Sequence, residues 1–389
     1  MFASLAFVFL FGLLGAAAFE KMKLPRIIGM LLVGILIGSY ALGLLDPTIL
    51  SISGDLRKLA LMLILLRAGL SLDLGDLKRV GRPAVMMAFV PATFEVLAVV
   101  LFAPMILGVT RVEAAVMGAV LGAVSPAVVV PRMVRLMEEG RGTKQGVPQM
   151  IMAGASCDDV YVIVLFSTFT RMAQGGGAHL ADFAAVPVSI VLGALSGAVC
   201  GWLLHRLFER AKAAETMRII LTLAAGCLLI ALEGWLDGKV ALSGLLGVMG
   251  MAVMLRRCGD VRAISAGIGK LWQAAEVMLF VLVGAAVDIR YTLAAGAGAV
   301  LLILLALVIR SIGVALCVAG TKLTKKERLF CVIAYLPKAT VQAAIGATPL
   351  AMGLPCGNLV LSVAVLAILI TAPLGAIGMD ATSERLLQK

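Results

Sequence analysis

Two adjacent carboxylates, Asp158 and Asp159, lie in the segment MAGASCDDVYVIVLF, residues 152–166, which is otherwise apolar enough to cross a bilayer. An ionised aspartate at the membrane midplane costs roughly 2.5–3.5 kcal/mol on insertion scales, so a pair must face a protein interior or a wet cavity. A carboxylate paired to a base, or a pair at a helix end, is the structural alternative. The apolar run on the C-terminal side of the pair argues against a helix end. The pair is therefore a candidate functional site.

Carboxylate oxygens are ligands that a small, hard cation such as Na⁺ or Li⁺ prefers. Burial and like charge disfavour two ionised carboxylates, so near neutral pH the pair should hold either protons or a metal cation. Competition for one site would produce exchange. Adjacent residues on a helix point about 100° apart, so Asp158 and Asp159 cannot flank one peptide bond as the aspartates of an intramembrane protease do. The pair indicates a transporter that is not an enzyme and needs no cofactor.

The composition is that of a polytopic membrane protein. Hydrophobic residues make up 62% of the 389, charged residues 14%, and the mean hydropathy is +1.09, which no soluble surface would keep in water. The net charge of +11 does not indicate a nucleic-acid partner, because no basic run with interleaved aromatic residues is present. The seven cysteines show no paired spacing and are interpreted as packing residues.

Apolar stretches close to the length that a helix needs to cross the hydrocarbon occur thirteen times. They run approximately over 2–19, 24–43, 56–72, 83–107, 113–131, 147–170, 183–205, 216–234, 239–255, 264–287, 292–319, 328–350 and 357–378. We therefore expect an all-α polytopic membrane protein with about 13 transmembrane helices. The loops on the C-terminal side carry 24 of the 33 Lys and Arg residues and the other loops six. The positive-inside rule then places the N-terminus outside and the C-terminus in the cytoplasm.

The two halves of the chain repeat each other. LLRAGLSLDLGDL at 65–77 aligns with VLVGAAVDIRYTL at 281–293, which pairs Asp73 with Asp288 in helices seven apart. An odd offset reverses the orientation, so the prediction is two inverted six-helix repeats joined by a linker helix. Glu95 and Arg310 each follow the aligned aspartate by 22 residues, which makes them expected salt-bridge partners.

Prolines recur in the fifth helix of each repeat. GAVLGAVSPAVVVPRM contains Pro126 and Pro131, and YLPKATVQAAIGATP contains Pro337 and Pro349. Proline removes a backbone donor, so the pattern predicts two broken helices that cross near the midplane, with free carbonyls and dipole ends available to a cation. Lys338 at the second break would offset the negative end of a half-helix.

Two further residues are expected at these breaks. Ser125, beside Pro126, is uncharged and joins Asp158 and Asp159 as a candidate ion or proton ligand. Thr340 belongs with Pro337 and Lys338 to the second break. The expected metal ligands for Na⁺ or Li⁺ are the two aspartates.

The stretches LLRAGLSLD, GAVSPAVVVPRM, GASCDDV and YLPKATVQAAIGATPL resemble the monovalent cation:proton antiporter superfamily, in the sodium/proton antiporter branch that includes the vertebrate sodium/hydrogen exchangers of the bacterial type. The resemblance implies a homodimer in which Asp159 is the principal ion and proton carrier, with Asp158 beside it. It also implies a division into dimerisation helices 1–3 (1–72), core helices 4–6 (83–170), linker helix 7 (183–205), dimerisation helices 8–10 (216–287) and core helices 11–13 (292–378).

Two positions depart from the pattern of these relatives. Many electrogenic members have Lys where this chain has Arg310, and that Lys pairs with the first aspartate, whereas an arginine keeps its proton. If Arg310 pairs with Glu95 instead, Asp158 is left free. Ser125 replaces an acid that some relatives carry at the break.

The function predicted is a secondary antiporter of the cell (inner) membrane that exchanges Na⁺ or Li⁺ for H⁺ by alternating access. Its expected partners are a second copy of itself, membrane lipids, monovalent cations and protons. A K⁺/H⁺ antiporter and a sodium-coupled organic-anion symporter of related fold remain alternatives. The symporter would need a roomy substrate cavity and has less use for twin acids.

Overall fold

The computed structural model describes residues 1–72, 81–176, 180–236, 240 and 242–388, and within these ranges it contains no strand. Its helices are α1 (Phe2–Lys21), α2 (Arg26–Ile37), α3 (Pro47–Ser51), α4 (Ser53–Ser71), α6 (Arg82–Met87), α7 (Val90–Leu107), α8 (Arg111–Leu121), α9 (Pro126–Glu138), α10 (Val147–Arg171), α11 (Leu180–Ala211), α12 (Glu215–Leu236), α13 (Gly244–Cys258), α14 (Arg262–Ala285), α15 (Ile289–Cys317), α16 (Lys325–Ala334), α17 (Thr340–Ile345), α18 (Thr348–Ala351) and α19 (Gly357–Leu386). The all-α class predicted from composition is confirmed.

Every one of the thirteen predicted spans has a helical counterpart. In the described part of the chain, nine segments are long and apolar enough to cross a membrane by length and composition. Other spans fall short of that test, as α2 does with 12 residues. The number of membrane crossings stays a prediction. Asp73, the first member of the aligned aspartate pair, lies outside the described residues.

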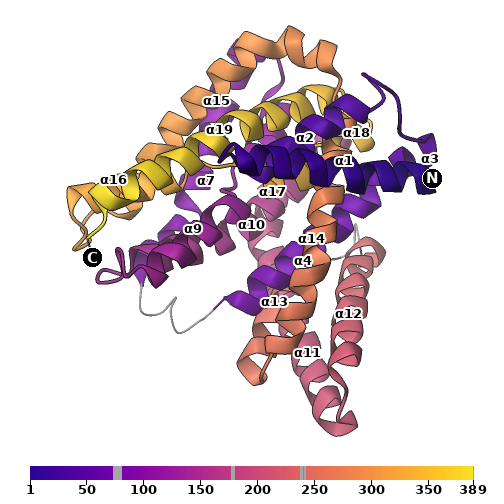
Figure 1. Ribbon diagram of the computed structural model, residues 1–389, viewed down its shortest axis with the longest axis vertical. Helices are drawn as coiled ribbons and strands as arrows, with labels where there is room; N and C mark the ends of the chain where they lie inside the picture. The colour runs from indigo at the N-terminus through magenta and orange to yellow at the C-terminus, as the bar shows by residue number, and fades with distance from the viewer. Residues whose placement is uncertain (73–80, 177–179, 237–239, 241, 389) are drawn as a thin grey trace. The chain divides into compact units, whose positions relative to one another are not determined.

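The chain forms two compact units. The first comprises the described residues within 1–57, 74–174 and 277–389, and the second those within 58–73 and 175–276. In the first unit α15 lies along both α7 and α19, and α7 also packs on α8 (Figure 1). In the second unit α11 packs against α13, which also contacts α12. The division into core and dimerisation helices stays a prediction.

Two predicted spans are interrupted near their midpoints. The first break, residues 122–125, separates α8 from α9, and the second break, residues 335–339, separates α16 from α17. Pro126 follows the first break and Pro337 lies in the second, where a missing N–H and a restricted preceding residue end the helix. Pro131 takes no part in the first break, because α9 continues through it. A proline keeps a helical φ and removes only one donor, so α9 loses a single hydrogen bond there.

A third interruption was not expected from the sequence. The predicted span 83–107 is divided at residues 88–89 into α6 and α7. Pro91, in the first turn of α7, cannot donate to the preceding turn, which accounts for the division. Pro349 similarly lies in the first turn of the short α18.

The two broken helices begin with the same capping arrangement. Thr110 and Glu113 form a capping box at the start of α8, and Thr324 and Glu327 form one at the start of α16. In each box the threonine hydroxyl accepts from the glutamate N–H, while the glutamate carboxylate accepts from the threonine N–H. The boxes occupy matching places in the two halves, which agrees with the predicted internal repeat.

Candidate functional site

The first and second breaks are in direct contact. The N–H of Ser125 donates to the carbonyl oxygen of Pro337 at 2.8 Å. In a continuous α-helix the Ser125 N–H would donate to the carbonyl oxygen of Leu121. The contact with Pro337 replaces that hydrogen bond, which the first break removes. The predicted crossing of two broken helices is therefore held by backbone atoms of both.

Side chains from the second half of the chain donate hydrogen bonds to the carbonyl oxygens at the end of α8. Lys338 Nζ donates to Leu121 O at 2.6 Å, and Arg310 Nη1 donates to Gly122 O. The amide nitrogen of Gln342 donates to Leu121 O at 3.2 Å and to Ala123 O at 2.9 Å.

The carbonyl oxygens of residues 121–123 each accept at least one hydrogen bond. A carbonyl oxygen has two lone pairs, so cation binding by carbonyl groups at the break stays a prediction. The positive side chains offset the negative end of α8, which is the compensation expected of Lys338.

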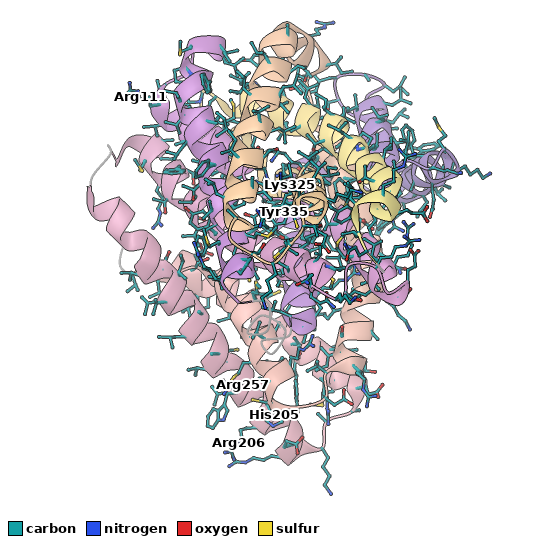
Figure 2. The ribbon with its side chains drawn as sticks, turned by 90° about the vertical axis from the view of Figure 1, so that its left-hand side faces the viewer. Arg111, His205, Arg206, Arg257, Lys325 and Tyr335 are labelled. Atoms are coloured by element: carbon teal, nitrogen blue, oxygen red, sulfur yellow. The ribbon has the colours of Figure 1, made fainter. Side chains whose placement is uncertain are left out.

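Arg310, on α15, binds four acceptors while only 1% exposed. Besides Gly122 O, its guanidinium donates to Glu95 Oε2 at 2.7 Å, to Asp158 Oδ2 at 3.0 Å and to the carbonyl oxygen of Tyr335 at 3.0 Å. The ring of Tyr335, which Figure 2 shows among the helices of the first unit, lies 5.6 Å from the guanidinium carbon. From the sequence, Glu95 and Asp158 are alternative partners of Arg310, whereas in the structure Arg310 binds both. The planar fork of arginine makes this possible.

Lys338, in the second break, shares Glu95 with Arg310. Its ammonium lies 2.6 Å from Glu95 Oε1 and 2.7 Å from Oε2. Its backbone N–H donates to the hydroxyl of Thr371 on α19 at 2.9 Å, which fixes the second break against that helix. The lysine and Glu95 are both fully buried.

The two aspartates on α10 differ in their surroundings. Asp158 Oδ2 accepts from the Val124 N–H at 2.8 Å and from Arg310 at 3.0 Å, so this carboxylate binds the first break. Asp159 is 1% exposed, and its Oδ1 has no hydrogen-bond partner among the described residues. Asp158 is therefore hydrogen-bonded to two other elements, whereas Asp159 Oδ1 is left without a partner in the described chain.

Five charged side chains thus lie within the first unit at 0–1% exposure: Glu95, Asp158, Asp159, Arg310 and Lys338. Three acids against two bases leave one negative charge when all are ionised. One proton or one monovalent cation neutralises that charge. Within the described residues no group of three or more His, Cys, Asp or Glu is placed to hold a metal ion.

Other buried oxygens at the crossing also lack partners in the described part of the chain. They are the hydroxyl oxygens of Ser125 and Thr340, Asp158 Oδ1 and the amide oxygen of Gln342. Buried polar atoms are nearly always hydrogen-bonded, so several unpaired oxygens around one crossing need an explanation. Carboxylate, hydroxyl and carbonyl oxygens are the donor set that a hard cation takes.

Three residues of the site were not identified from the sequence. They are Gln342, Tyr335 and Thr371, which bind α8, Arg310 and the second break respectively. The available signal for Gln342 was an uncharged polar side chain inside an apolar span, which points to the protein interior. Tyr335 takes part through its backbone carbonyl, for which the sequence holds no signal.

The chain is similar to known proteins over nearly its whole length. The chain matches the family model described as sodium/hydrogen exchanger, transmembrane, over residues 5–382. It is 32% identical over 398 residues to sodium/hydrogen exchanger 9B2 of Xenopus tropicalis, which covers 97% of this chain and 73% of that relative. The human sodium/hydrogen exchanger 9B2 is 33% identical over 380 residues, with coverages of 94% and 70%. The fold is similar to that of the sodium proton antiporter MjNhaP1 from Methanocaldococcus jannaschii, with a TM-score of 0.85, 21% identity and coverages of 98% and 97%.

Proposed function

Since this chain belongs to the sodium/hydrogen exchanger family, we propose that it exchanges Na⁺ for H⁺ across a membrane, with Asp159 binding the two ions in turn. The family match extends over nearly the whole chain, which is accordingly a multi-pass membrane protein. Its cargo is Na⁺ and H⁺, and the proposed role needs no resident cofactor. Li⁺, which has the same charge and a preference for oxygen ligands, is proposed as a second substrate.

The observation that carries the proposal is the contrast between the two aspartates. Asp158 is bound by Arg310 and by the Val124 N–H, whereas Asp159 is equally buried and its Oδ1 has no partner in the described chain. A buried carboxylate without a partner is costly when ionised. Either a proton or a cation removes that cost, and the two cannot do so together. Mutual exclusion at Asp159 couples the two fluxes.

The transport cycle requires Asp159 to face each side of the membrane in turn. We propose alternating access, in which the two crossed broken helices and α10 move as one group. Support comes from the side chains that join them: Arg310 and Lys338 bind the end of α8, and Asp158 binds the first break. Relative movement inside this group would break several buried polar contacts at once.

We place the protein in the cell (inner) membrane, with its N-terminus outside and its C-terminus in the cytoplasm. The bias of Lys and Arg between alternate loops supports this orientation. In Figure 2, His205 and Arg206 near the end of α11 lie at the same end of the second unit as Arg257 near the end of α13. Arg206 and Arg257, on two different helices, thus lie at one end of this unit, as the proposed orientation expects.

A homodimer in lipid completes the proposal. Helix α1 belongs to the proposed dimerisation helices and presents large apolar side chains outward, with Phe2 82%, Leu10 62% and Leu14 64% exposed. An apolar face of this kind suits either lipid or a second copy of the chain.

The decisive experiment measures dissipation of a pH gradient in proteoliposomes on addition of NaCl, LiCl or KCl. The wild type should respond to Na⁺ and Li⁺, and Asp159→Asn should be silent, because an amide cannot take up and release the proton. Asp260→Asn provides a matched control, since Asp260 is an exposed acid paired with Arg262. That variant should behave as the wild type.

Activity in Asp159→Asn equal to the wild type would refute the role of Asp159. A wild type that moves no proton with any of the three cations would refute exchange itself. A response to KCl larger than to NaCl would assign the protein to K⁺ instead.

A further inference from the structure

Gln342 on α17 has a buried side-chain amide whose nitrogen is hydrogen-bonded and whose oxygen has no hydrogen-bond partner among the described residues. Its Nε2 donates to two carbonyl oxygens of the first half of the chain, Leu121 O at 3.2 Å and Ala123 O at 2.9 Å. Its Oε1 is buried and has no hydrogen-bond partner in the described chain, although the side chain is 0% exposed. The nitrogen end holds the end of α8, and no described residue uses the oxygen end.

The orientation of this amide is fixed by its neighbours. The reverse orientation would place Oε1 against two carbonyl oxygens and lose both hydrogen bonds. Leaving a buried carbonyl oxygen unpaired is energetically unfavourable. A ligand that arrives during transport would recover that cost.

The free oxygen belongs to the region that holds the aspartates. Gln342 binds Ala123, and Asp158 binds the next residue, Val124, through its N–H. Consecutive Cα atoms are only about 3.8 Å apart, so the two side chains converge on neighbouring residues of the first break. Ser125, whose hydroxyl is also buried and without a partner among the described residues, comes next in the chain.

We propose that Gln342 is a specificity-determining residue of the transport site, whose amide oxygen binds the partly dehydrated cation while its amide nitrogen holds the end of α8. The inference rests on the proposed exchange at Asp159. A neutral carbonyl oxygen adds a ligand for Na⁺ or Li⁺ without adding charge, so it contributes to the choice between cations and leaves the proton count unchanged.

The test compares Gln342→Met with the wild type in proteoliposomes, using apparent KM and kcat for Na⁺, Li⁺ and K⁺ at fixed pH. Methionine has a similar length and no amide oxygen. The apparent KM for the preferred cation should rise about ten-fold, the order of one lost polar contact, by unequal factors for the three ions. The kcat should change little. Gln273→Met, at an exposed position on α14, is the matched control and should keep all three values.

A merely structural Gln342 gives a different pattern. If kcat falls equally for all ions with each KM unchanged, or if nothing changes, the inference is overturned. Should Gln342→Met fail to fold, Gln342→Glu decides, because it keeps the shape and the oxygen ligand while a second oxygen replaces the amide nitrogen. A ligand role predicts that this variant has an altered order of preference among the three ions. An unaltered order overturns the inference.

The failure of this inference is distinguishable from failure of the proposed function. Thermal stabilisation of the detergent-solubilised protein by NaCl, LiCl or KCl provides a readout that needs no transport. A wild type that exchanges, with Gln342 variants of unchanged ion preference and unchanged stabilisation, refutes only the role of Gln342. A wild type that does not exchange refutes the premise.

Discussion

Glu95 accepts hydrogen bonds from both bases at the crossing, because Arg310 and Lys338 each approach it within 2.7 Å. Removing an ion from water carries a penalty of several kcal/mol, which only close partners repay. Without Glu95 the two cations would face each other, and Asp158 alone would remain close to Arg310. The stability of the crossing therefore depends on this carboxylate more than on any exposed ion pair.

Glu95→Gln should lower the stability of the protein strongly. An amide removes the negative charge between two buried cations, and breaking a buried pair costs about 3–5 kcal/mol. The thermal unfolding midpoint in detergent measures the effect, with Glu20→Gln at an exposed position as the control. Equal midpoints for Glu95→Gln and the control would show that the contacts with Glu95 add nothing to stability.

At the scale of elements, α10 must approach the second break closely to bring its aspartates to the crossing. Gly154, one turn before Asp158, lies directly against the hydroxyl of Tyr335, where a Cβ atom would collide with it. A Cβ there would also come within 2.9 Å of Met87 Cβ. The glycine thus sets the distance between α10 and the residue that holds Arg310 through its carbonyl.

Gly154→Ala should slow exchange and lower the unfolding midpoint, because the methyl group displaces Tyr335 and with it Arg310. Tyr335→Phe should be nearly neutral alone, since the hydroxyl has no hydrogen-bond partner in the described chain. The double variant should recover part of the loss, with contact to Met87 limiting the rescue. Gly269→Ala, where a Cβ meets nothing within 4 Å, is the control. Full additivity of the two substitutions would contradict this account.

Much of the site could be predicted from the sequence where the signal is local or repeats. The adjacent aspartates stand out in an apolar span, and Pro126 and Pro337 mark the two breaks. The repeat spacing pairs Glu95 with Arg310, and the structure has them 2.7 Å apart.

Other features depend on how distant segments meet. Three such features join residues more than 150 positions apart in the chain. They are the contact of Arg310 with Asp158, the hydrogen bond from Gln342 to Ala123 after α8, and the close approach of Gly154 to Tyr335. No periodicity or motif in the sequence predicts such long-range contacts. Proline alone also misleads, because Pro131 continues a helix whereas Pro91 interrupts one. The effect of a proline depends on the residues that surround it in the folded chain.

At the scale of the whole molecule, the buried charges bear on how much charge the proposed exchange moves. Arginine keeps its charge, so Arg310 cannot serve as a second proton carrier. Lys338 is held against Glu95, which leaves Asp159 as the proposed carrier. Under this proposal we expect one Na⁺ to replace one H⁺, with no net movement of charge.

Exchange should therefore be insensitive to the membrane potential. A net charge moved through 100 mV would gain or lose about 2.3 kcal/mol, which is readily detected. Proteoliposomes clamped with valinomycin and K⁺ at zero and at about −100 mV should dissipate the pH gradient at equal rates on addition of Na⁺. A clear difference between the clamps would mean that more than one proton moves per cation, and that a second titrating group exists.

The permanent charge of Arg310 has a physiological consequence. An exchanger that moves one ion for one ion comes to rest when the sodium ratio across the membrane equals the proton ratio, so one pH unit sustains about a ten-fold sodium ratio. A cell whose membrane has depolarised and whose interior is more alkaline than its surroundings would keep expelling sodium until the sodium ratio matched the proton ratio. The same cell in an alkaline medium would gain sodium through this protein, however large its membrane potential.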